Sequence, residues 1–95
     1  MRVVTIIATA ELSERLERDI LQLGARGMTI ARVDGHGAHG AHRASFLDRG
    51  NVRIESIVDH KLADRLLEHV VKHYDGLEIV AFVYDVQAVP KPRFE

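Results

Sequence analysis

Glycines and histidines alternate in a short segment in the middle of the chain, and they are the first candidates for binding chemistry. Gly35, Gly37 and Gly40 have the spacing of a dinucleotide-binding fingerprint. That fingerprint needs a helix directly after the glycines, so that the helix N-terminus meets the pyrophosphate, and here a loop is expected instead. Glycines at a strand end still let backbone N–H groups approach a ligand and form an anion-binding concavity. A flexible loop without a ligand is the other interpretation of these residues.

The histidines suggest a metal site as an alternative. His36, His39 and His42 are spaced by three and could converge on a transition metal if the loop curled, while His69 and His73 are four residues apart on one face of an expected helix. No carboxylate lies between the helical pair as in a zinc-protease helix, and loop histidines are often only solvated. We therefore predict no metal site, and keep His36, His39 and His42 as the alternative ligands.

Two cations near the end of the chain are candidates for binding phosphate. Lys91 and Arg93 alternate with Pro90 and Pro92 just beyond the last expected strand, and the prolines are expected to hold this tail extended. The cations could reach a phosphate group, or they could belong to a solvated terminus. Catalysis has less support. The serines show no arrangement with a histidine and an acid, and no carboxylate pair stands out, so we expect no enzyme.

Composition narrows the classes of function. Thirteen basic and fourteen acidic residues among 95 give a net charge of −1, which does not favour nucleic-acid binding. There is no cysteine, so disulfides, thiolate metal sites and cysteine nucleophiles are excluded. The sequence enters a strand-like run at once, without the pattern of a signal peptide, and no apolar run is long enough to span a bilayer. We expect a cytoplasmic protein that is not inserted in a membrane.

The elements that position these residues follow from hydrophobic periodicity. Strands are expected over residues 3–9, 28–34, 51–58 and 79–89. One helix is expected from Glu11 to the stop at Gly24 and Gly27, and a second from an N-cap at Asp59 to Gly76. The apolar stripes of the two helices are Leu12, Leu16, Ile20 and Leu23, and Leu62, Leu66 and Val70 with Tyr74 at the end. The predicted order is β-α-β-β-α-β, an α+β arrangement in one domain over residues 1–95.

Two segments resemble the PII signalling superfamily, and the likeness extends over essentially the whole chain. The segment that resembles the family's second strand and T-loop is Gly27-Met28-Thr29-Ile30-Ala31-Arg32-Val33-Asp34-Gly35-His36-Gly37. The segment that resembles its last strand and basic tail is Asp85-Val86-Gln87-Ala88-Val89-Pro90-Lys91-Pro92-Arg93. The resemblance implies a ferredoxin-like fold with an antiparallel four-stranded sheet, two helices on one face and a trimeric assembly. It implies a T-loop at about residues 36–50 and a basic tail at residues 90–95.

Within the superfamily the chain differs from the nitrogen regulators. It has Ala38-His39 where those carry an Arg-Gln pair, it lacks a tyrosine in the loop, and residues 74–78 lack the lysine of the usual phosphate-binding B-loop. It is more similar to the PII-like proteins of inorganic-carbon metabolism, of the SbtB and carboxysome-associated type. That likeness implies an effector that is AMP, ADP, ATP or cyclic AMP, held in clefts between subunits, with bicarbonate as a possible further ligand. It also implies a T-loop that contacts a partner, for instance a bicarbonate transporter.

The resemblance also implies which residues bind the nucleotide. Gly35 and Gly37 line the cleft, Thr29 lies near the base, Ile79 and Val80 border the adenine, and Lys91 and Arg93 meet phosphate. His39, His42 or Arg43 takes the place of the loop arginines of the SbtB type. Two other hypotheses remain open at this point: a metal-responsive PII-like protein that uses the loop histidines, and a plain ferredoxin-like oligomerisation module.

Overall fold

A computed structural model describes residues 1–34, 36–37, 40–41 and 50–94 of the chain. The elements in chain order are β1 (Arg2–Thr9), a 3-10 turn η1 (Ala10–Leu12), α1 (Ser13–Leu23), β2 (Thr29–Val33), β3 (His36–Gly37), β4 (Gly40–Ala41), β5 (Asn51–Val58), α2 (His60–His73), β6 (Ile79–Asp85) and α3 (Lys91–Phe94). The four long strands and two long helices follow the predicted order β-α-β-β-α-β. The short strands β3 and β4 pair only with each other, within the segment predicted as a loop.

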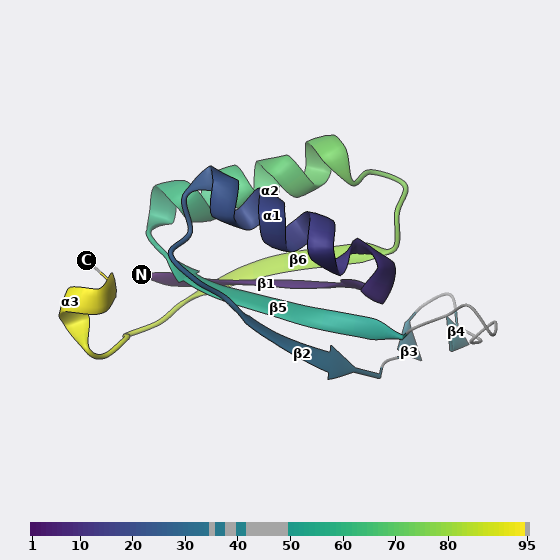
Figure 1. The fold of residues 1–95 in the computed structure, drawn as a ribbon, viewed down its shortest axis with the longest axis horizontal. Coiled ribbons are helices and arrows are strands. Elements are labelled where there is room, and N and C mark those ends of the chain that lie inside the picture. Colours follow the sequence, from purple (N-terminus) through teal and green to yellow (C-terminus); the bar gives the residue numbers. More distant parts are fainter. Residues whose placement is uncertain (35, 38–39, 42–49, 95) are drawn as a thin grey trace.

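The four long strands form one antiparallel sheet in the order β2-β5-β1-β6. Helices α1 and α2 lie side by side on one face of this sheet, and the other face carries no helix (Figure 1). The predicted fold class is therefore confirmed. Among the described residues, no helix is long and apolar enough to cross a membrane.

The hydrophobic core lies between the sheet and the two helices. Strand β5 alternates as predicted, with Val52, Ile54 and Ser56 buried and Arg53 exposed between them. The hydroxyl of Ser56 donates a 2.6 Å hydrogen bond to the carbonyl of Gly27, so this polar side chain is satisfied inside the core. The helices contribute the predicted stripes, and the buried helical residues are Leu16 and Ile20 of α1 and Ala63 and Leu66 of α2.

The helix boundaries show how local chemistry starts and stops each element. Asp59 caps α2, because its carboxylate accepts a 2.8 Å hydrogen bond from the backbone N–H of Leu62. Gly24 ends α1 with φ of 120°, a conformation that costs glycine little. The first helix was expected from Glu11, but the regular helix begins at Ser13, after the 3-10 turn.

The last strand is shorter than predicted. It was expected to reach Val89, but β6 ends at Asp85, which pairs with Arg2, the first residue of β1. Beyond this pair β1 offers no strand residue, and Pro90 and Pro92 have no N–H group to donate to a ladder. The tail was also expected to be extended, but residues 91–94 form one helical turn, in which the N–H of Arg93 donates to the carbonyl of Pro90 at 3.1 Å.

Candidate functional site

Five of the predicted site residues lie at two opposite ends of the sheet. Gly37 belongs to β3, which follows the end of β2, and Ile79 and Val80 begin β6. Strand pairing brings the end of β2 and the start of β6 to the same end of the sheet, on its two opposite edges. Helix α3, which contains Lys91 and Arg93, lies beyond the other end, as Figure 1 shows. Because β5 spans the sheet in eight residues, the two ends are about 23 Å apart. One chain alone does not bring these residues around one small molecule.

The other predicted residues lie in the middle of the sheet or outside the described residues, and the burial of Ile79 and Val80 differs. Thr29 is exposed on the edge strand β2 and pairs with Glu55 in the middle of the sheet. Ile79 packs against the helix-side core, whereas Val80 points to the opposite face and is 53% exposed. Gly35, His39, His42 and Arg43 lie outside the described residues, and of His36 and Gly37 the structure describes only the strand. The roles of all these residues stay predictions.

A groove of about 740 Å³ runs along the tail at the end of the sheet that carries Lys91 and Arg93. Its wall comes from the junction after α1, the end of β5, the start of α2 and the tail. The apolar part of the lining consists of Met1, Ala25, Ile57, Val58, Leu62, Val86, Ala88 and Val89. The cationic part consists of the two predicted residues, Lys91 and Arg93, and of Arg26. The groove therefore combines an apolar wall with three positive charges.

Arg26 and the apolar wall were missed at the sequence level. An arginine after a helix-ending glycine is an ordinary surface feature, so its type and spacing give no sign of a site. It reaches the groove only because the tail folds back past the end of α1, where its guanidinium Nη1 donates to the carbonyl of Arg93 at 3.3 Å. The pair of prolines is the one sequence signal related to this contact, because prolines favour a turn that can bring the tail back toward α1.

The charge of the groove is weakly compensated. Of the described residues that line the groove, Asp59 is the only one with a carboxylate, and one of its oxygens already accepts the N–H of Leu62. Within the part of the chain that the structure describes, Arg26, Lys91 and Arg93 form no ion pair. An anionic group in the groove would therefore find cations that are not engaged in ion pairs with the described carboxylates.

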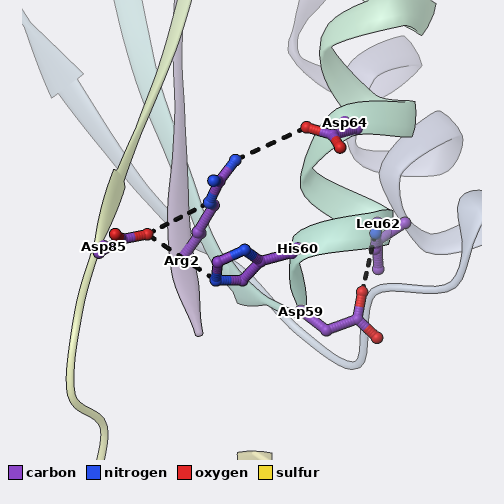
Figure 2. Close-up of polar contacts among 6 residues, drawn as sticks. All are labelled: Arg2, Asp59, His60, Leu62, Asp64 and Asp85. Carbon is purple, nitrogen blue, oxygen red and sulfur yellow. Dashed lines mark hydrogen bonds and ion pairs between the residues drawn. The ribbon is translucent and has the colours of Figure 1, made fainter.

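A polar cluster fixes the point where the tail leaves the sheet. Figure 2 shows Arg2 between two carboxylates, with Nε 3.2 Å from Asp85 at the end of β6 and a terminal nitrogen 3.6 Å from Asp64 of α2. His60 Nε2 lies 3.8 Å from the same oxygen of Asp85. The N–H of Val86 donates to the carbonyl of Met1 at 3.1 Å. The tail is thus attached at its start by these contacts and near its end by Arg26.

The face of the sheet without helices carries a row of apolar side chains. Phe82 and Tyr84 of β6 stack with ring centroids 6.4 Å apart, and they are 44% and 48% exposed. Val80 and Ile57 on the same face are also exposed, while Val3 at the centre is buried between its neighbours. Exposed apolar side chains that share one flat face are typical of an interface with another protein chain.

The helical histidines belong to a polar cluster between α1 and α2. Asp19 Oδ2 accepts a 2.6 Å hydrogen bond from the hydroxyl of Tyr74 and lies 2.8 Å from His69 Nε2. Burial alone would raise the pKa of Asp19, but these two hydrogen bonds and the charges of His69 and Arg15 outweigh it, so that its pKa lies below 3.8. Burial and the bond to Asp19 raise the pKa of Tyr74.

Nothing in the described residues supports a metal site. They contain no group of three or more histidine, cysteine, aspartate or glutamate side chains that could hold a metal ion. His69 and His73 have ring centroids 4.5 Å apart, but Asp19 engages the Nε2 of His69. The alternative ligands His39 and His42 lie outside the described residues, so that alternative stays without support.

Comparison with known proteins identifies the family. The model of the family "Nitrogen regulatory protein P-II" matches residues 1–93. The chain therefore belongs to the P-II family, whose members are regulatory proteins. A sequence comparison with curated proteins found no match.

Solved structures of PII-like proteins share the fold over nearly the whole chain. A protein described as a PII-like signaling protein from Thermus thermophilus has a TM-score of 0.80 and 28% identity, over 99% of this chain and 94% of that one. CPII from Thiomonas intermedia K12, bound to ADP and bicarbonate, has a TM-score of 0.84 and 25% identity, over 99% and 93% of the two chains. A third structure, of CPII bound to ADP, AMP and bicarbonate, has a TM-score of 0.81 and 26% identity, over 98% and 92%.

Proposed function

We propose that this PII-like signalling protein binds an adenine nucleotide in clefts between the subunits of a homotrimer. In this proposal the tail of one subunit supplies Lys91 and Arg93 to the phosphates. The neighbouring subunit supplies the start of its loop, with Gly35 and Gly37, and the start of β6, with Val80 near the adenine. The nucleotide is AMP, ADP, ATP or cyclic AMP.

The observation that carries this proposal is the groove along the tail, with its apolar wall and weakly compensated cations. A nucleotide has both parts of the matching chemistry, since its base is a flat apolar surface and its phosphates are anions. The separation of the two groups of predicted residues along the sheet supports a cleft made by two chains. The structures of CPII with ADP and with AMP are consistent with this assignment.

The open sheet face supports the trimer. Val3, Ile57, Phe82 and Tyr84 offer an apolar surface that association would remove from water, at a gain of about 25 cal/mol for each Å² buried. A thin core in a chain of 95 residues makes such association a useful addition to stability. We propose that this face forms the inner surface of the assembly.

A second part of the proposal concerns the location of the protein in the cell and the partner that it regulates. We propose that the protein is cytoplasmic, that it belongs to the SbtB and carboxysome-associated branch, and that its loop at residues 36–50 contacts a partner of inorganic-carbon metabolism such as a bicarbonate transporter. The support is the sequence resemblance and the presence of bicarbonate in the CPII complexes. Bicarbonate itself is proposed as a second ligand.

Calorimetric titration tests the proposal. The wild-type chain is titrated with AMP, ADP, ATP and cyclic AMP, each with and without bicarbonate, and light scattering measures the mass of the assembly. We expect a trimer that binds at least one nucleotide, and a Lys91→Gln, Arg93→Gln variant with affinity lower by about tenfold or more, since each substitution removes a charge-assisted hydrogen bond. A Lys72→Gln, Arg65→Gln variant, with the same charge change on the exposed face of α2, is the matched control. A monomer, or no heat with any of the four nucleotides, would contradict the proposal.

A further inference from the structure

Arg26 adds a third cation to the groove. It lies in the junction between α1 and β2, outside both the tail and the loop. It lines the groove together with Lys91 and Arg93, and its guanidinium is bonded to the tail through the carbonyl of Arg93. We infer that Arg26 is a phosphate-binding residue that makes the site selective for nucleotides with more phosphate groups. This inference rests on the proposed function, which assigns a nucleotide to the same groove.

The backbone around Arg26 is held on both sides. The preceding residue, Ala25, is buried, and its N–H donates to the carbonyl of Ile20 at 3.2 Å in the turn that ends α1. The following residue, Gly27, has its carbonyl bonded by the buried Ser56 at 2.6 Å. A long, exposed side chain therefore extends from a fixed point of the scaffold. Because the backbone is already held, binding of a ligand by Arg26 has no added cost of ordering the main chain at this position.

The guanidinium has donors left for an anion. An arginine carries five N–H groups in a planar fork, and the bond to the carbonyl of Arg93 uses one of them. Within the described residues, Arg26 forms no ion pair that would compete for the others. A phosphate group near the tail can thus be bonded by Arg26 while the same guanidinium keeps the tail in place.

Three like charges in one groove should favour the more highly charged ligand. The cations repel one another, and Asp59 is the one carboxylate among the described residues of the groove. Each additional phosphate group brings negative charge that relieves this repulsion, whereas adenosine brings none. Removal of the Arg26 charge should therefore affect ATP and ADP most, AMP less and adenosine least.

The experiment compares Arg26→Gln, Arg26→Lys and the control Arg18→Gln, which removes an exposed charge on α1 outside the groove. Each is titrated calorimetrically with adenosine, AMP, ADP and ATP. We expect Arg26→Gln to raise the Kd for ADP and ATP about tenfold and to leave that for adenosine within about twofold, with Arg26→Lys between Arg26→Gln and the wild type.

Two results would overturn the inference while the proposed function stands. In the first, the wild type binds ADP, and Arg26→Gln binds ADP no more weakly than Arg18→Gln does. In the second, Arg26→Gln loses affinity for adenosine and for ADP by the same factor. The second result would mean that Arg26 acts only by holding the tail. If the wild type itself binds none of the four ligands, both the inference and the proposed function are wrong.

Discussion

Replacement of Tyr74 by phenylalanine removes one hydroxyl group from the junction between α1, α2 and the sheet. The ring of Tyr74 is completely buried, and its hydroxyl donates to Asp19 at 2.6 Å. The guanidinium of Arg15 lies over the same ring, 4.4 Å from its centroid. A phenylalanine ring keeps the apolar contacts and the cation–π contact. The variant therefore tests the hydrogen bond alone.

The expected loss follows from the charge of the acceptor. A hydrogen bond to an ionised group contributes about 1.5–3 kcal/mol. Asp19 keeps its contact with His69 when the tyrosine hydroxyl is gone, so we expect a loss in the lower part of this range, about 2 kcal/mol, in the free energy of unfolding at pH 7.

The loss should depend on pH in a defined direction. The pKa of Asp19 is below 3.8 in the folded protein, so the ionised carboxylate contributes stability above that pH, and the contribution is lost as the pH falls through the lower, folded value. Tyr74 is one of the two hydrogen-bond donors that lower this pKa. The difference in stability between wild type and Tyr74→Phe should therefore be largest at neutral pH and should shrink as the pH falls below 3.8.

Urea unfolding followed by circular dichroism measures the difference. The two proteins are compared at pH 7 and pH 3 at the same subunit concentration, because the stability of an oligomer depends on concentration. A second pair carries Asp19→Asn, in which the charged acceptor is absent. If Tyr74→Phe has the same cost in the Asp19→Asn background, or the same cost at both pH values, the hydroxyl and the carboxylate are not coupled and the reasoning is wrong.

Two further predictions concern the cap of α2 and the open face of the sheet. Asp59→Ala removes the side-chain acceptor for the N–H of Leu62 and should lower the free energy of unfolding by about 1 kcal/mol. Asp59→Ser keeps an acceptor oxygen and should retain most of the wild-type stability. Equal losses for the two variants in urea unfolding would contradict the capping role. Phe82→Lys places a charge on the apolar face and should convert the proposed trimer to species of smaller mass, measured by light scattering, whereas Lys72→Glu on α2 should not. An unchanged mass for Phe82→Lys would exclude this face as the interface.

Much of the fold could be predicted because its signals are local. Strand β5 occupies the predicted residues 51–58, since a strand with one face on the core buries every second side chain. The cap at Asp59 was also predicted, because an aspartate directly before an apolar helical stripe is commonly the N-cap of that helix. The glycine stop at Gly24 is of the same kind.

The features that could not be predicted depend on residues that are far apart in the sequence. The end of β6 is set by the start of β1, where Arg2 pairs with Asp85, and no window of the sequence around Asp85 contains this information. The bond between Asp19 and Tyr74 joins residues 55 positions apart, and that between Arg26 and Arg93 joins residues 67 apart. Each of these polar contacts needs the helices and the tail to be placed first, so residue type and spacing alone could not reveal them.

The distance between the loop and the basic tail determines what a bound nucleotide can do in the proposed trimer. Because the two groups of residues lie at opposite ends of one sheet, each subunit of the proposed trimer would take part in two different clefts, one through its tail and one through its loop. A ligand that binds between two chains stabilises their association by mass action, by RT ln(1 + [L]/Kd) for each site. In the proposal, the same ligand also contacts the start of the loop that is proposed to meet a partner. In the proposed trimer, occupancy of the basic groove of one subunit would therefore be linked to the loop of the neighbouring subunit, so that the nucleotide couples one chain to the next.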